Sequence, residues 1–211
     1  MLAADQHRAW TCLPIGDLDD IVGPRCPLIL APHPDDESLG CGGLIAACCE
    51  RARPPVVVFL TDGGMSHPGS KAFPRDVLVR TREREAADAA AILGLPAGRL
   101  FFLRQPDAEA PTGGAGFRHV VDAVASLAGR FHCTALLAAW RLDPHCDHAA
   151  AALIATDAAR RAGIPHLAYP VWGWTLPAGQ TIDAGAPVGW RLDIEPYRQR
   201  KQLAIAAHAT Q

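Results

Sequence analysis

The sequence predicts an α/β fold in which a mostly parallel sheet carries helices on both faces. Short runs rich in Val, Ile, Leu and Ala alternate with longer Ala-rich stretches of helical periodicity. Two clusters rich in His and Asp directly follow two of the apolar runs. Alternating strands and helices imply right-handed crossovers and a parallel sheet, and both clusters then lie beyond strand C-termini, where open α/β sheets bind ligands.

Five apolar runs are the predicted strands. They are short and mostly uninterrupted by polar residues, as expected of strands that are covered on both faces. They comprise residues 27–31, 54–61, 100–103, 135–140 and 166–171. Residues 188–194 are a further candidate, as an edge strand.

Helices are predicted at residues 44–52, 75–93, 117–129 and 149–162, with a closing helix at 196–208. Residues 1–26 lack clear periodicity and are expected to form an arm with a short helix around residues 17–21. The loops 62–74 and 104–116 are long enough to shape a binding site. A chain of 211 residues suits a single domain spanning residues 1–211.

Charge and composition exclude several kinds of partner. The formal net charge is −2 and no dense run of Lys or Arg occurs, so nucleic acid is not expected as a ligand. No apolar run approaches the ~20 residues of a membrane span. The N-terminal segment carries Asp5, Asp17, Asp19 and Asp20 where a signal peptide would be cationic and then apolar, so we expect a cytoplasmic protein.

The chain has seven cysteines, an odd number with no CxxC pair. This pattern argues against a secreted disulfide framework and against a structural zinc knuckle. Most of the thiols are expected to be reduced and buried. Cys41 and Cys146 adjoin polar motifs and are the candidates for a functional thiol.

The first polar cluster is Ala31-Pro-His-Pro-Asp-Asp-Glu-Ser38, which places one imidazole and three carboxylates within five positions. His33 and Asp36 stand three residues apart in a turn, so their side chains can converge on a metal. Asp35 then remains free to act as a base.

The second cluster is Arg141-Leu-Asp-Pro-His-Cys-Asp-His148, which follows the fourth predicted strand. A catalytic zinc site takes three protein ligands, with N and O donors at ~2.0–2.2 Å, and keeps one position for water. His33, Asp36 and His148 can supply that set.

The remaining residues of the clusters suit the other steps of a hydrolysis. Zinc lowers the pKa of a bound water to about 7, and Asp35 can accept the proton as that water attacks an amide or ester carbonyl. His145 is predicted to stabilise the resulting oxyanion. Asp147 is predicted to orient His145.

Simpler interpretations exist for the first cluster. A lone His-Pro or Asp-Asp is usually a turn, and Asp35 or Glu37 can cap the following helix. The glycines of Gly40-Cys-Gly-Gly43 resemble a nucleotide loop only loosely, because the spacing is not GxGxxG and nearby carboxylates repel phosphate. A second His/Asp cluster at another strand end favours the metal site.

The motifs Ala31-Pro-His-Pro-Asp-Asp-Glu37 and Pro144-His-Cys-Asp-His148 resemble those of the zinc-dependent de-N-acetylases of the PIG-L/LmbE-like family. The similarity extends to Thr61-Asp-Gly63, to residues 82–94 and to residues 201–211. It implies a Rossmann-like three-layer α/β/α sandwich and hydrolysis of an N-acetyl group, commonly from an N-acetylglucosamine conjugate.

By motif position, the resemblance implies zinc ligands at His33, Asp36 and His148, and a general base at Asp35. It implies that His145 stabilises the oxyanion or protonates the amine. Two positions depart from the family pattern. Cys146 stands where the second motif commonly has proline, and Asp143 stands where some sugar deacetylases carry a tyrosine.

Three further residues are candidates for substrate contacts. Arg82 matches a substrate-contacting arginine of the family, and the alternative is a helix-surface partner for Glu85 or Asp88. Trp172 and Trp174 alternate in a segment predicted to be extended, so both can face the cleft as sugar platforms. Burial in the core is the alternative for these indoles.

The primary hypothesis is a metal-dependent N-deacetylase that acts on a small GlcNAc-type sugar or sugar conjugate. Zn²⁺ is the expected cofactor, and Fe²⁺, Co²⁺ or Ni²⁺ also accepts imidazole and carboxylate ligands. One alternative is an amidase that cleaves a larger acyl or thiol conjugate at the same site. The other is a non-catalytic metal- and sugar-binding module, although such a module needs no free carboxylate like Asp35. The sequence does not predict the aglycone or the oligomeric state.

Overall fold

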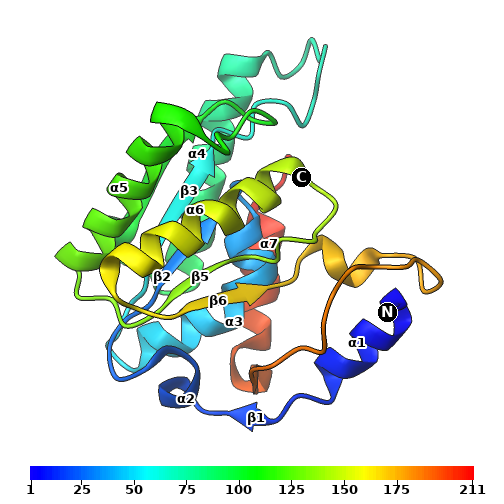
Figure 1. The fold of residues 1–211 in the computed structure, drawn as a ribbon. Coiled ribbons are helices and arrows are strands. Elements are labelled where there is room, and N and C mark those ends of the chain that lie inside the picture. The colour runs from blue at the N-terminus through cyan, green and yellow to red at the C-terminus, as the bar shows by residue number, and fades with distance from the viewer.

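The computed structural model describes all residues from 1 to 211 and has a parallel five-stranded sheet between two layers of helices (Figure 1). The predicted three-layer α/β/α fold is therefore confirmed. The strand order is β4-β3-β2-β5-β6. The strands are Leu28–Ala31 (β2), Val56–Thr61 (β3), Leu100–Gln105 (β4), Leu136–Ala139 (β5) and His166–Tyr169 (β6).

Each face of the sheet is covered by its own hydrophobic cluster. Helices α3 (Asp36–Glu50), α4 (Arg75–Ile92) and α7 (Arg198–Ala207) cover one face. Helices α5 (Gly114–Arg130) and α6 (Cys146–Ala162) cover the other (Figure 1). In β2, alternate residues enter opposite clusters, which explains why this strand is apolar at every position.

Two helices begin earlier than the sequence predicts. Helix α3 begins at Asp36 rather than at residue 44, because its glycines lie inside the helix and let neighbours pack against it. Helix α6 begins at Cys146 rather than at residue 149. Each polar cluster therefore runs directly into the first turn of a helix.

The N-terminal segment is more ordered than an arm. Helix α1 (Ala3–Thr11) was not predicted, whereas the short helix expected near residue 17 is confirmed as α2 (Leu18–Val22). Asp17 caps α2 through a capping box with Asp20.

Residues 188–194 do supply a strand, but it does not lie at the edge of the main sheet. Strand β7 (Arg191–Leu192) pairs in parallel with β1 (Ile15–Gly16) in a separate two-stranded sheet. The two segments form a clasp beside the main sheet. Its closure is supported by the Arg191 side chain, which donates from Nε to the Leu13 carbonyl at 2.8 Å.

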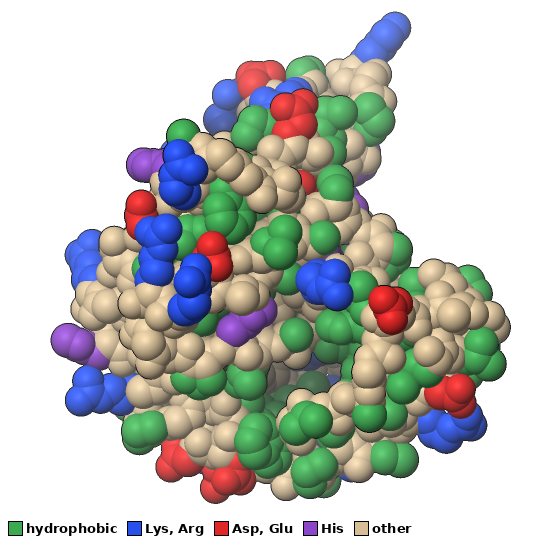
Figure 2. All heavy atoms as spheres, viewed as in Figure 1, with side chains coloured by type: hydrophobic (Ala, Val, Ile, Leu, Met, Phe, Trp, Pro, Cys, Tyr) green, Lys and Arg blue, Asp and Glu red, His purple; other side chains and the backbone are tan.

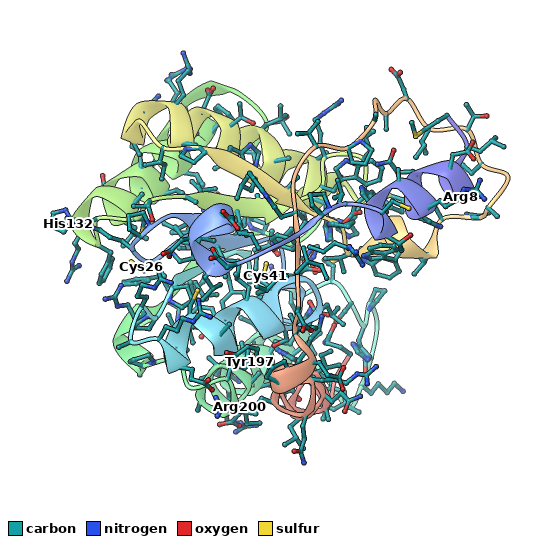
Figure 3. The ribbon with its side chains drawn as sticks, turned by 90° about the horizontal axis from the view of Figure 1, so that it is seen from below. Arg8, Cys26, Cys41, His132, Tyr197 and Arg200 are labelled. Atoms are coloured by element: carbon teal, nitrogen blue, oxygen red, sulfur yellow. The ribbon has the colours of Figure 1, made fainter.

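The closing helix is confirmed as α7, which packs against α3 and α4. A 3₁₀ turn, η3 (Glu195–Tyr197), leads into it. Tyr197 and Arg200 both reach Glu50 at the end of α3, from the segment labelled at the base of Figure 3. Two further 3₁₀ turns are η1 (Ala97–Arg99) and η2 (Trp172–Thr175). None of the helices combines the length and apolar composition needed to cross a membrane.

Candidate metal centre

The two polar clusters meet because their strands are neighbours. Strands β2 and β5 pair in parallel at the centre of the sheet, and the chain order reverses between them. The segments that leave their C-terminal ends lie in the crevice where such sheets place ligands. The first turn of α3 then supplies Asp36, and the first turn of α6 supplies His148.

Three donor groups converge at this point. The Asp36 Oδ2 atom lies 3.1 Å from His33 Nδ1 and 3.3 Å from His148 Nε2. All three residues are buried. Two ligands bound tetrahedrally to one zinc ion at ~2.0–2.1 Å are about 3.3 Å apart, so the observed spacings suit a shared metal.

His148 carries the clearest sign of a metal ligand. Its Nδ1 lies 2.9 Å from the Asp143 carboxylate, and this bond places the proton on Nδ1 in the neutral imidazole. The opposite atom, Nε2, is buried and has no hydrogen-bond partner. An imidazole nitrogen held beside the Asp36 carboxylate, with Asp143 fixing the ring from behind, suits a metal ligand.

A second set of donors surrounds the other side of His33. Its Nε2 lies 3.1 Å from Asp147 Oδ2 and 3.3 Å from Asp107 Oδ1. His145 completes this group, whose ligand atoms all lie within 4.8 Å of one another. Burial lowers the pKa of His33, but hydrogen bonds to Asp107, Asp147 and Asp36 outweigh it and raise the pKa to about 11.

Asp35 lies beside these ligands and is held by Arg82. Arg82 is buried and donates to the carbonyl oxygens of Gly63 and Pro34, at 2.9 and 2.8 Å, while its Nη2 lies 3.3 Å from Asp35 Oδ1. The helix-surface interpretation of Arg82 is therefore wrong. Burial raises the pKa of Asp35, and the charge of Asp36 raises it further, to about 7, against the opposing charge of Arg82.

His145 and Asp147 are adjacent to the centre but contact each other differently from the prediction. The backbone N–H of Asp147 donates to His145 Nδ1 at 3.2 Å. The Asp147 carboxylate instead accepts the backbone N–H groups of Ala108 and Ala110 and contacts His33. The predicted orientation of His145 by the Asp147 carboxylate is thus absent.

Two carboxylates at the site were not predicted as functional residues. Asp143 contacts His148 and also accepts backbone N–H groups from Val171, Trp172 and Gly173. Asp107, in the loop predicted at residues 104–116, contacts His33 and accepts the N–H of Met65 at 2.8 Å. The position of Asp143 inside the second cluster is a usable signal, whereas Asp107 has no motif around it.

The Trp172–Trp174 segment is a 3₁₀ turn and not an extended strand. Both indoles are half exposed. Trp174 packs against Trp10 and lines an apolar cavity of about 600 Å³ between α1, β6 and residues 183–192. Figure 2 shows the molecule hollowed here within a rim of hydrophobic side chains. The lining does not include His33, Asp36 or His148, so Trp174 lies outside the group of metal-binding candidates.

The two candidate thiols differ in exposure. Cys41 is buried, and burial raises its pKa far above the ordinary value, which makes it an inert core residue. Cys146 is exposed at the start of α6, with Sγ 3.7 Å from the Ala108 carbonyl oxygen.

Comparisons with known proteins identify relatives of this chain. A family model described as PIG-L, GlcNAc-PI de-N-acetylase, matches residues 28–159. A probable N-acetyl-alpha-D-glucosaminyl L-malate deacetylase 2 from Bacillus anthracis is 30% identical over 189 residues, which cover 89% of this chain and 81% of that protein. The matched segment of the family model contains both polar clusters.

Solved structures share the fold at lower identity. N,N'-diacetylchitobiose deacetylase from Pyrococcus horikoshii has a TM-score of 0.69 at 20% identity, over 89% of this chain and 70% of that chain. GalB, the 4-carboxy-2-hydroxymuconate hydratase from Pseudomonas putida KT2440, has a TM-score of 0.68 at 22% identity, over 89% and 80%. Because a deacetylase and a hydratase share this fold, the fold alone does not identify the reaction.

Proposed function

This chain belongs to the PIG-L family of de-N-acetylases, and from that membership we propose that it is a hydrolase that removes the N-acetyl group from a small GlcNAc-type sugar or sugar conjugate. The observation that carries the proposal is the convergence of His33, Asp36 and His148 with Asp35 beside them. A buried carboxylate beside these donors, with its pKa raised to about 7, is suited to general-base catalysis, which a binding site does not require.

In this proposal, His33, Asp36 and His148 hold a divalent metal, for which zinc suits the donor set. Bound there, the metal would polarise the amide carbonyl and lower the pKa of water. Asp143 fixes the ring of His148 from behind through its bond to Nδ1. This contact keeps Nε2 turned toward the site.

The protein's own groups move the protons. Asp35 accepts a proton from the attacking water, which forms the new C–O bond to the acetyl carbon. His145, whose pKa is lowered by burial and by the nearby His33 and His148, donates a hydrogen bond from its neutral ring to the oxyanion, and the proton held by Asp35 passes to the leaving nitrogen. The C–N bond breaks, and the products are acetate and a free amino sugar.

Acetate release tests the proposed reaction. Protein loaded with Zn²⁺, and separately with Fe²⁺ or Co²⁺, is incubated with N-acetylglucosamine conjugates that differ in aglycone. We expect release from at least one conjugate, and loss of at least about 10²-fold in Asp35→Asn, since general-base catalysis contributes 10²–10⁴-fold. The metal content of Asp35→Asn should equal that of the wild type.

Two results would redirect the assignment. Faster cleavage of bulkier acyl groups than of acetyl would identify an amidase on a larger conjugate. No release from any conjugate, together with sugar binding by metal-loaded protein, would identify a binding module.

The metal assignment has its own check, because Asp143→Ala should lower metal affinity by about 10–100-fold in a chelator competition.

A further inference from the structure

The backbone of Asp35 adopts a conformation that L-amino acids rarely take. Its φ is 149° and its ψ is −31°, at the residue immediately before α3. Such a conformation is unfavourable and persists only where the surrounding structure enforces it. Arg82 anchors one side of the turn through the Pro34 carbonyl. The other side needs a partner for the Asp35 N–H.

Glu37 is that partner. Its Oε2 accepts the N–H of Asp35 at 3.0 Å, while the Asp35 side chain makes no capping bond to the helix. Glu37 is fully buried. Its other oxygen, Oε1, accepts from Ser38 Oγ at 2.6 Å and lies 3.0 Å from His208 Nε2.

His208 reaches this carboxylate from the far end of the chain. It is the residue at which α7 ends, and α7 packs on α3 and α4. The imidazole is 5% exposed, and its Nδ1 is buried without a partner. Nε2 donates to the Glu37 carboxylate and also lies 3.4 Å from Ser38 Oγ, so the shorter contact of this ring is to the residue that holds the Asp35 backbone.

We propose that His208 is a positioning residue for Asp35, acting through Glu37. The inference rests on the proposed function, in which Asp35 is the base. When His208 donates to Oε1, the carboxylate is fixed and Oε2 stays on the Asp35 N–H. Without that donor, the buried carboxylate turns toward other partners, and the unfavourable conformation of Asp35 loses its support.

Amide exchange tests the proposal without any need for activity. Hydrogen–deuterium exchange is followed in peptides covering residues 33–38 in His208→Asn, whose amide is too short to reach Glu37, and in His208→Gln, whose amide nitrogen takes the place of Nε2. Thr210→Val is the matched control, because Thr210 makes a tail hydrogen bond of 2.7 Å to Glu85 and none to Glu37. We expect faster exchange in His208→Asn only.

Kinetics then separate positioning from a purely structural role. In His208→Asn, kcat should fall by about 10–100-fold with KM and bound metal unchanged, and His208→Gln should restore most of the loss. Added to Asp35→Asn, the same change should cost no further activity, since the base it positions is already gone.

The outcomes are distinguishable from failure of the proposed function. If the wild type releases no acetate from any conjugate, the reaction is wrong, and the exchange data alone decide the Glu37–Asp35 contact. If acetate is released but His208→Asn matches Thr210→Val in both exchange and kcat, the positioning role is overturned. Full additivity with Asp35→Asn would overturn it as well.

Discussion

At the scale of single residues, the site concentrates unfavourable features at Asp35. Its backbone is strained, its carboxyl group is buried, and the charges of Asp36 and Glu37 oppose its ionisation. Arg82 offsets part of this cost. A group with a pKa near neutrality is suited to accept and release a proton at physiological pH. The same residue therefore carries both the backbone strain and the proposed proton transfer.

Two substitutions that both remove the Asp35 charge isolate the backbone strain. Asp35→Gly should be more stable than Asp35→Asn by about 1–3 kcal/mol, because only glycine adopts a positive φ of this size at low cost. Urea unfolding of the two variants measures the difference. At an unstrained position, a Gly variant is usually less stable than an Asn variant. An Asn variant equal to or more stable than the Gly variant would therefore show that Asp35 is not strained.

The sequence predicts site residues that belong to a motif and misses those delivered by other elements. His33, Asp36 and His148 stand at strand ends, and the structure brings them together. Asp107 and His208 reach the same region from a loop and from the C-terminal tail. Their contacts depend on tertiary packing, which no local pattern records.

At the scale of elements, the glycines of α3 determine how closely other segments approach. A Cβ at Gly40 would overlap the ring of Tyr169, and one at Gly43 would overlap Ile194. A Cβ at Gly42 would lie 3.0 Å from Cγ of Lys201, whose side chain is flexible. The helix gives up intrinsic propensity at these positions so that β6 and the C-terminal segment can pack against it.

Alanine substitutions separate propensity from packing in α3. Gly40→Ala should destabilise the protein by about 1–3 kcal/mol because the ring of Tyr169 is buried and cannot move freely. Gly42→Ala should be neutral or stabilising by up to about 1 kcal/mol, since Lys201 can turn away. Chemical denaturation gives both values. Equal effects of the two changes would contradict the packing role of Gly40.

Helix α7 should contribute to stability in a pH-dependent way through His208. Burial lowers the pKa of His208, but the hydrogen bond and charge of Glu37, with Asp35, outweigh burial and Arg82 and raise it above about 6.5. The stabilisation from the charged pair is therefore full below about pH 6.5 and is lost as pH rises through the raised pKa.

Unfolding free energies of wild type and His208→Gln, measured from about pH 6 upward, check this sign. The advantage of the wild type should shrink with increasing pH. If the difference in unfolding free energy between the two proteins stays constant with pH, His208 does not lose its proton in the folded state over this pH range. Thr210→Val again serves as a control, because Thr210 does not titrate.

Element predictions were accurate where burial imposes a pattern. Strands β2 and β5 are apolar and buried at every position because both faces of the sheet are covered at its centre, and apolar runs also located β3, β4 and β6. Helix α1 is not evident in the sequence because its buried residues are Ala3, Gln6 and Trp10, of which only Trp10 is a large apolar side chain. In the β1–β7 clasp, Ile15 pairs with Arg191 and Gly16 pairs with Leu192, so the partners are about 175 positions apart in the chain. At this separation, sequence pattern carries no information about which strands pair.

At the scale of the whole molecule, the tryptophans divide the chain into two observable parts. All five lie in or beside α1 and the segments that follow β5 and β6, namely Trp10, Trp140, Trp172, Trp174 and Trp190. Residues 11–139, which include four of the five strands of the main sheet, contain none. Indole fluorescence therefore reports the region around α1 and the clasp. Far-UV circular dichroism is dominated by the helices that cover the two faces of the main sheet.

Asp143 couples these two parts. Its carboxylate contacts His148 in α6 and also accepts the N–H groups of Val171 and Gly173, while the Gly173 carbonyl lies 2.7 Å from His7 Nε2 in α1. We expect the chain to unfold as one cooperative unit spanning residues 1–211, with coincident fluorescence and circular dichroism transitions. In Asp143→Ala, the fluorescence transition should move to lower denaturant than the dichroism transition, because the bonds that join the parts are lost. Separate transitions in the wild type would instead show two independent units.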